Sequence, residues 1–412
     1  MFLRSYYYKL YQLEAPNTKK ESNFQLINTV NNFFFLIYGK EIHKRRWLKI
    51  SEKLWGKVAR NFVNAGGIPI PISDNIIKII QTLITEEQAN FLQIFRKRSL
   101  TFDQIKAKSY LDDNAINKML NELIDNGIIM GIPSSTGIMI YYLVSILPGL
   151  LEFPFMKGEK GEKQKTLARL MDTLFDELSH LTQSNYDMVI NQFRSANPMD
   201  RVVPVEIEID VPQEIVMPYE EVKGIIERND VISVNYCYCR NWKDNLNDPC
   251  KLETPLLNCF QFGKYAQSLI DHNFGKAISK EETIKILKES ENAGLVHKAI
   301  HLKNPEQEEQ AFCNCCSCCC QFFQLYQRGI FPFHTLTYYI ANLEQDKCIG
   351  CGTCVEKCAV DAIELIDDLS VTSLDKCIGC GLCVHHCPEN ARNLERTGIR
   401  KVFIAPPKLN PL

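Results

Sequence analysis

Hydrophobic residues recur at helical spacing between residues 74 and 126. The spacing predicts three successive helices and then a longer one over 112–126, which begin at Ser73-Asp74, Thr85, Leu100-Thr101 and Asp112. Asn126-Gly127 ends the last helix, and a Pro-Ser-Ser-Thr-Gly turn then separates two apolar strands, Ile128–Gly131 and Ile138–Val144. Helices followed by a two-stranded ribbon are in the winged-helix order, so we predict a winged-helix-like domain over residues 66–150.

The longest of these helices would be the DNA-reading element of a winged helix, and its charge is unfavourable for that role. Residues 112–126 carry Asp112, Asp113, Glu122 and Asp125 against Lys118 alone. Phosphate would meet this face with like charge. We therefore predict no specific DNA binding and interpret the domain as a packing or dimerisation module.

The pattern elsewhere predicts helices mixed with short strands. An apolar stripe predicts a helix over about 163–181 in a helical connector, residues 151–200. We predict that residues 201–345 form an α/β domain. Within it, Val202–Val216 should be extended, which suits an edge strand or a connector, and Val231–Val234 should be a buried strand. Residues 1–65 form a poorly defined helical region. Its basic amphipathic segment 40–60 is either a docking helix or the solvated face of a packed helix.

Composition and charge limit the cellular compartment and the kinds of partner that we expect for the protein. The chain has 412 residues and a net charge of −2, so no global field favours nucleic acid or anionic lipid. The N-terminus lacks a signal-peptide pattern, and the best membrane candidate, residues 137–151, is short and interrupted by Pro148. All 18 cysteines lie between Cys237 and Cys387. We expect a cytoplasmic protein without a membrane span, in a reducing and anoxic setting.

Eight cysteines form two copies of one motif. Three thiols are spaced by two residues and a fourth follows after three more, which is the run of bacterial-type ferredoxins, and its fourth cysteine ligates the other cluster. We therefore predict two [4Fe–4S] clusters, the first held by Cys348, Cys351, Cys354 and Cys387, the second by Cys377, Cys380, Cys383 and Cys358. Gly350, Gly352, Gly379 and Gly381 should take positive φ, which lets backbone amides approach the sulfur atoms.

Alternatives to this ferredoxin domain, residues 346–395, are weak. Zinc usually takes its cysteines as two separated pairs, and disulfides need an oxidising compartment. Ala359 follows Cys358 where the motif has proline, which removes no ligand. Residues 396–412 hold three prolines among the last seven residues, and we expect a loose tail.

The other ten cysteines lie in the central domain and predict a third centre. They are Cys237, Cys239, Cys250, Cys259, Cys313, Cys315, Cys316, Cys318, Cys319 and Cys320. Cys237/Cys239 and the run from Cys313 to Cys320 suit two facing halves of one cage. The alternatives are a redox-active dithiol, a structural zinc site and buried thiols. Arg240 would raise the reduction potential of a thiolate cluster nearby. For His297, we favour a buried histidine with its hydrogen bonds satisfied over a metal ligand.

Residues 86–387 resemble a family of multi-domain iron–sulfur proteins of anaerobic archaea and bacteria, known as ferredoxin-type or dicluster-binding proteins. The resemblance rests on the helices leading into the winged helix, the paired ferredoxin motifs and four shorter motifs. These four are Pro148-Gly149-Leu-Leu-Glu152, Cys237-Tyr-Cys239-Arg240, Gly294-Leu-Val-His297 and Cys313-Asn-Cys315-Cys316. The resemblance implies anaerobic electron transfer and indicates no particular substrate.

The sequence thus predicts an α+β multidomain electron-transfer protein, an oxidoreductase component without an assigned catalytic residue. Residues 344–392 carry nine acidic side chains against four basic ones, which favours docking to a basic redox partner protein. Two alternatives stay open. One is a redox-sensing winged-helix transcriptional regulator, and the other is a reductase whose catalytic centre is the central cluster.

Overall fold

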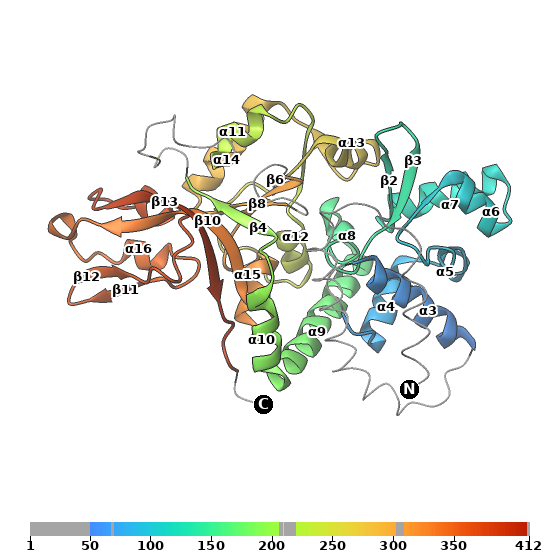
Figure 1. The fold of residues 1–412 in the computed structure, drawn as a ribbon, viewed down its shortest axis with the longest axis horizontal. Helices are drawn as coiled ribbons and strands as arrows, with labels where there is room; N and C mark the ends of the chain where they lie inside the picture. Colours follow the sequence, from blue (N-terminus) through green and yellow to red (C-terminus); the bar gives the residue numbers. More distant parts are fainter. Residues whose placement is uncertain (1–49, 67–69, 206–208, 210–219, 302–308, 410–412) are drawn as a thin grey trace, which may run out of the picture.

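A computed structural model describes residues 50–66, 70–205, 209, 220–301 and 309–409. Figure 1 shows the elements following one another along the long axis, with helices α3 to α7 at one end and strands β11 and β12 at the other. None of the helices in these residues is long and apolar enough to cross a membrane. The structure mixes helices and sheets, as predicted.

The N-terminal region consists of helices and a small antiparallel sheet of order β1-β3-β2. Its elements are α3 (Ile50–Ala65), α4 (Asp74–Leu83), α5 (Glu86–Leu92), β1 (Ser99–Thr101), α6 (Phe102–Ser109), α7 (Asp113–Asp125), β2 (Ile129–Pro133) and β3 (Met139–Leu143). Side chains of Ser73, Thr85, Thr101 and Asp112 cap the four helices that they precede, which confirms the predicted starts. Strand β1 was not predicted, because this strand exists only through its pairing with β3.

Helix α3 is the described part of the predicted basic segment. Trp55, Val58 and Phe62 are buried in the core, while Lys53 and Arg60 are exposed. Within residues 53–60 the basic side chains therefore form the solvated face of a packed helix. The remainder of the segment, residues 40–49, lies outside the described residues.

One hydrophobic core joins the N-terminal region to the central domain. It extends from Trp55 through the stripe of α9 (Glu162–Ser184) to Trp242 and Ile330. The Trp242 indole donates to the carbonyl of Ala168 at 3.1 Å and meets Phe175 edge-on. Two short helices, α8 (Phe153–Met156) and α10 (Tyr186–Ser195), flank α9. The connector is thus part of the core between the two regions.

The central domain is built on an eight-stranded sheet of order β13-β10-β4-β8-β9-β6-β5-β7. Its strands are β4 (Asp200–Val203), β5 (Ile232–Tyr236), β6 (Leu257–Phe262), β7 (Lys276–Ala277), β8 (Val296–Ile300), β9 (Ala311–Cys315), β10 (Phe333–Leu343) and β13 (Arg392–Ile404). The helices are α11 (Val222–Glu227), α12 (Tyr238–Asn245), α13 (Gly263–Asp271), α14 (Lys280–Asn292) and α15 (Gln321–Gln327). Only the β4–β10 pair is parallel.

Strand β4 corrects the expectation of an edge strand or connector for Val202 and Val203, the first two residues of the predicted Val202–Val216, whereas residues 206–208 and 210–216 lie outside the described residues. It pairs with β8 on one side and β10 on the other, so it lies inside the sheet. The four residues of β4 precede Pro204, so no proline interrupts its hydrogen bonds.

The ferredoxin motifs lie in an excursion between β10 and β13. The two strands pair from Phe333↔Ile404 to Leu343↔Arg392. The excursion contains η3 (Gln345–Lys347), α16 (Thr353–Glu356), the hairpin β11 (Ile363–Ile366) and β12 (Leu369–Thr372), and α17 (Leu382–His385). The prediction of a loose tail from residue 396 is wrong, since residues 396–404 belong to β13 and the prolines come only after it.

Candidate metal–sulfur sites

The two ferredoxin loops have the same backbone geometry. Gly350 and Gly379, with φ of 68° and 63°, precede the second thiol of each motif, and Gly352 and Gly381, both with φ of 79°, follow it. This confirms the positive φ expected at all four glycines. A Cβ atom at Gly379 would lie 2.2 Å from the Tyr339 carbonyl oxygen, so no larger residue fits there.

The first set of predicted ligands lines one pocket. Cys348, Cys351 and Cys354 meet Cys387 of the second motif there, beside Leu343 and Leu365. Hydrogen bonds from the backbone at Gly350 and Ser370 lower the pKa of Cys348. The Ala391 amide donates to Cys387 Sγ at 3.3 Å. Backbone donors around thiols stabilise the thiolate form that binds metal.

The second set gathers in the same crossed manner. Burial raises the pKa of Cys380, and the nearby charges of Cys383, Cys358 and Cys377 raise it further. Burial likewise raises the pKa of Cys383 to about 12. The Ala362 amide donates to Cys358 Sγ at 3.2 Å. Cys358 of the first motif thus lies among the thiols of the second.

The ten central cysteines separate into two groups. One pocket is lined by Cys237, Cys239, Cys259, Cys313, Cys315 and Cys320, and Cys316 of the other group also reaches its lining. We call this the six-thiol pocket. It lies between the β5–α12 junction, the β9–α15 junction and β6. The other four form the four-thiol site: Cys250, Cys316, Cys318 and Cys319.

Cationic and amide groups surround the six-thiol pocket. Arg240 is buried and donates to Asn258 Oδ1 at 2.9 Å and to the Asn314 carbonyl at 3.0 Å. A hydrogen bond from Cys239 lowers the pKa of Cys237 to about 7, and Arg240 adds to this effect. The buried Asn258 Nδ2, in the pocket lining, has no hydrogen-bond partner among the described residues. These groups favour negative charge inside the pocket.

Lys298 adds a second buried cation on the Cys320 side. Its ammonium lies 3.1 Å from Asp200 and 4.1 Å from the Phe322 ring centroid, and Phe322 lines the pocket. Burial opposes ionisation of Cys320, yet hydrogen bonds from Cys239 and Cys315 together with Lys298 hold its pKa well below the usual range. The sequence analysis missed Lys298 because only sheet pairing brings it close to the cysteines.

His297 is a buried, satisfied histidine, as the sequence analysis favoured. Its Nδ1 lies 2.6 Å from Asn314 Oδ1 and its Nε2 lies 3.2 Å from Glu291 Oε1. Both ring nitrogens are therefore engaged. Through Asn314, the histidine supports the strand that carries Cys313 and Cys315.

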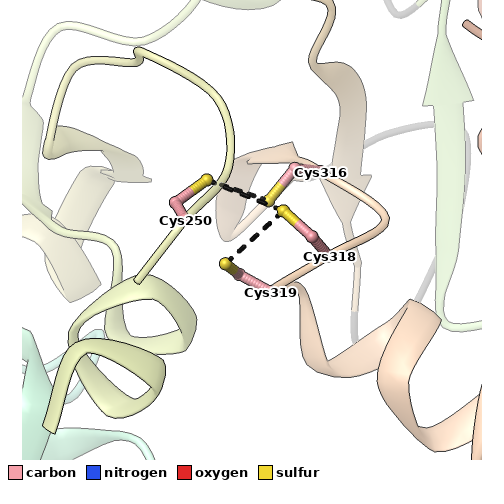
Figure 2. Close-up of side chains that lie close together, drawn as sticks. All are labelled: Cys250, Cys316, Cys318 and Cys319. Carbon is pink, nitrogen blue, oxygen red and sulfur yellow. Dashed lines mark hydrogen bonds between the residues drawn. The ribbon is translucent and has the colours of Figure 1, made fainter. Parts of the chain in front are cut away.

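The four-thiol site lies beside Leu295. Figure 2 shows its four side chains converging, with Cys250 facing the turn that carries the other three. The Sγ atoms of Cys250 and Cys316, of Cys250 and Cys318, and of Cys318 and Cys319 are each 3.7 Å apart. Cys316, Cys318 and Cys319 hold the pKa of Cys250 far below its usual range, because all three hydrogen-bond to its sulfur. The structure thus does not place all ten cysteines in one cage.

Comparison with known proteins identifies one part of the chain. Residues 341–394 match the family of 4Fe-4S dicluster domains. No curated protein and no solved structure matches the chain. The match spans both ferredoxin motifs and supports iron–sulfur cluster binding in this region. It leaves the N-terminal and central parts of the earlier resemblance as expectations.

Proposed function

We propose that the protein transfers electrons through two [4Fe–4S] clusters held by the crossed cysteine sets. Each cluster, when bound, supplies one-electron chemistry by changing its charge state without forming a bond to a substrate. The observation that carries the proposal is the pocket that unites Cys348, Cys351 and Cys354 with Cys387. The dicluster match of the same segment supports it.

The six-thiol pocket is proposed to hold a third iron–sulfur centre. Six thiols exceed the four that a cubane needs, so this centre would be of an unusual type or keep thiols in reserve. Arg240 and Lys298 offset part of the negative charge of the thiolates. Cys315 and Cys320 share a hydrophobic cluster with Cys354 and Cys377, and the Val205 amide donates to the Cys380 carbonyl at 3.0 Å. This continuity favours electron exchange between the pocket and the dicluster domain.

The surface around the dicluster domain suits a protein partner. Cys351 is exposed, and Ile349, Leu365, Ile366 and Leu374 are each between 44% and 64% exposed. Apolar side chains within an acidic region are typical of a transient redox interface with a basic partner. We propose a cytoplasmic redox partner protein as the occupant. Loss of electron transfer at high salt, with the cluster content unchanged, would support this surface.

We propose that residues 66–150 form a winged-helix-like module that packs or dimerises. The element order β1-α6-α7-β2-β3 and the sheet order β1-β3-β2 support the fold. The acidic charge of α7 argues against the rival function, a redox-sensing regulator, since Lys106 pairs with Asp113 at 2.6 Å and leaves the other carboxylates unbalanced. Anisotropy titration of the full chain with DNA tests the rival. A salt-sensitive, sequence-selective complex would favour it.

The decisive experiment is metal counting on the full chain purified without oxygen. We expect about eight irons and eight sulfides from the dicluster domain, and further iron from the central domain. Two interacting reduced clusters should be visible by electron paramagnetic resonance. The full chain is required because truncation before β13 would remove the pairing partner of β10. A protein that binds only zinc and has no reducible chromophore would refute the proposal.

A further inference from the structure

The four-thiol site combines two segments that are distant in the sequence. Cys250 comes from the loop after α12, while Cys316, Cys318 and Cys319 belong to the turn between β9 and α15 (Figure 2). Sixty-six positions separate Cys250 from Cys316. The four Sγ atoms all lie within 4.8 Å of one another. Convergence of four thiols from two segments indicates a common ligand.

The sulfur spacing fits one metal ion. In a tetrahedral site with metal–sulfur bonds of about 2.3 Å, neighbouring sulfurs lie about 3.8 Å apart. Three of the sulfur pairs in the four-thiol site are 3.7 Å apart, and all the others lie within 4.8 Å. A disulfide would need about 2.05 Å between two sulfurs and would leave the other two thiols unexplained. A single ion accounts for all four.

The dicluster cysteines provide an internal comparison. The ligands of a cubane bind four different irons, so their sulfurs stay farther apart than four sulfurs on one ion. Among the described residues, which include all 18 cysteines, only the four-thiol site brings three or more potential metal ligands so close together. Neither ferredoxin set nor the six-thiol pocket does so. The geometry therefore separates this site from every cluster site in the chain.

The surroundings complete a metal site. Cys316 and Cys319 are buried with Leu295, and Leu252 and Ala293 pack against them. The backbone at Leu252 donates to Cys250, and the backbone at Lys251 donates to Cys318. Such amide donors stabilise metal-bound thiolates. Arg240 interacts electrostatically with Cys316 and Cys250, which offsets part of the negative charge.

We propose that Cys250, Cys316, Cys318 and Cys319 bind one tetrahedral metal ion, Zn²⁺ or Fe²⁺, at a structural site distinct from the iron–sulfur clusters. Each sulfur that is still protonated loses its proton on binding, and four thiolates around one divalent ion give the occupied site a net charge of −2. The ion fixes the Cys250 loop to the turn that also presents Cys315 and Cys320 to the six-thiol pocket. This inference does not depend on the proposed electron transfer.

The test uses the full chain purified without oxygen, with zinc, iron and sulfide counted separately. X-ray absorption at the edge of the bound metal should show four sulfurs at about 2.3 Å. One zinc per chain identifies the zinc form. One iron in excess of inorganic sulfide identifies the iron form. Because this measurement needs no variant, it does not depend on the folding of a mutant.

Cys250→Ser should remove that one metal ion and leave the sulfide content and both dicluster signals unchanged. Cys250 is chosen because, unlike Cys316, it does not line the six-thiol pocket. Ser317→Ala in the same turn is the matched control and should keep the ion, since Ser317 is not one of the four ligands. Wild-type protein with no metal beyond its clusters would overturn the proposal. So would a Cys250→Ser protein that loses sulfide together with iron.

Discussion

The six-thiol pocket and the four-thiol site draw on the same stretch of eight residues, yet they differ in geometry. Cys313 and Cys315 are two residues apart on β9, so their side chains point to the same face of the sheet. Cys320, at the start of α15, lies on the same side as these two thiols. Cys316, Cys318 and Cys319 in the turn between them gather with Cys250 instead, and of these three only Cys316 also lines the pocket. One dense run thus supplies two sites with different ligand spacing.

The difference shows that ligand spacing in space distinguishes sites that cysteine density cannot. Among the described residues, no three ligand atoms of the six-thiol pocket all lie within 4.8 Å of one another, and two buried cations lie beside the pocket. This suits a multi-iron centre of high negative charge. The four-thiol site is tight and suits one ion.

Replacing one thiol of the six-thiol pocket should have the largest effect. Cys315→Ser is expected to remove most of the iron and sulfide of the central centre, because the cysteine is buried between Cys313 and Cys320. The ion of the four-thiol site and both dicluster signals should remain. Metal and sulfide analysis with electron paramagnetic resonance measures all three.

Cys318→Ser is the matched control for that variant, since it changes the same run by the same atom. It should have the reverse effect, losing the single ion and keeping sulfide. If both variants lose the same metals, the ten cysteines form one site and the comparison fails.

Replacing Arg240 should have an intermediate effect, because its charge acts on thiols of both sites. Arg240→Gln removes a buried positive charge near Cys237, so the potential of the central centre should fall by tens of millivolts, where about 59 mV is tenfold in a one-electron equilibrium. Potentiometric titration measures the shift. The dicluster potentials should move less.

Arg240→Lys serves as the control that keeps the charge and loses part of the hydrogen bonding to Asn258 and Asn314. It should restore most of the potential. An unchanged potential in Arg240→Gln would place the arginine in a purely structural role.

Replacing Glu152 should have the smallest effect. The change should alter the free energy of unfolding, and of the two sites it concerns only the six-thiol pocket. Burial raises the pKa of Glu152 to about 7 from 4.5. Burial also raises the pKa of Tyr238, which lines the pocket, and the charges of Cys239 and Glu152 raise it further. The folded state therefore favours the protonated acid. Stability from this group is fully present below pH 4.5 and is lost as pH rises to 7, by about 3 kcal/mol.

Glu152→Gln should remove this pH dependence, because an amide does not ionise. Denaturant unfolding of both proteins without oxygen, at pH 5 and pH 8, gives the difference between them. Equal pH dependence in the two proteins would show that Glu152 is not the titrating group. The metal content of the four-thiol site should be the same in both.

The sequence by itself determined the features that are local. Helix starts at Ser73 and Asp112 were predicted correctly, because a cap needs only the residues of the first turn. The ferredoxin loops followed for the same reason, since the positive φ of Gly350 and Gly379 belongs to a turn of a few residues. The sequence thus predicted the backbone of the two ferredoxin loops, within the segment that matches the 4Fe-4S dicluster domain family.

Only the tertiary structure decided which distant segments meet. Residues 396–404 of strand β13 were predicted as loose tail, because their partners in β10 lie 57 residues (Tyr339↔Arg396) to 71 residues (Phe333↔Ile404) earlier and nothing local reveals the pairing. Likewise, the cysteine run predicted a metal site without showing that Cys250 would join Cys318 while Cys259 joined Cys313. Local periodicity describes the direction of each side chain along its own segment. Which distant segment a side chain then contacts depends on the order of the strands in the whole sheet.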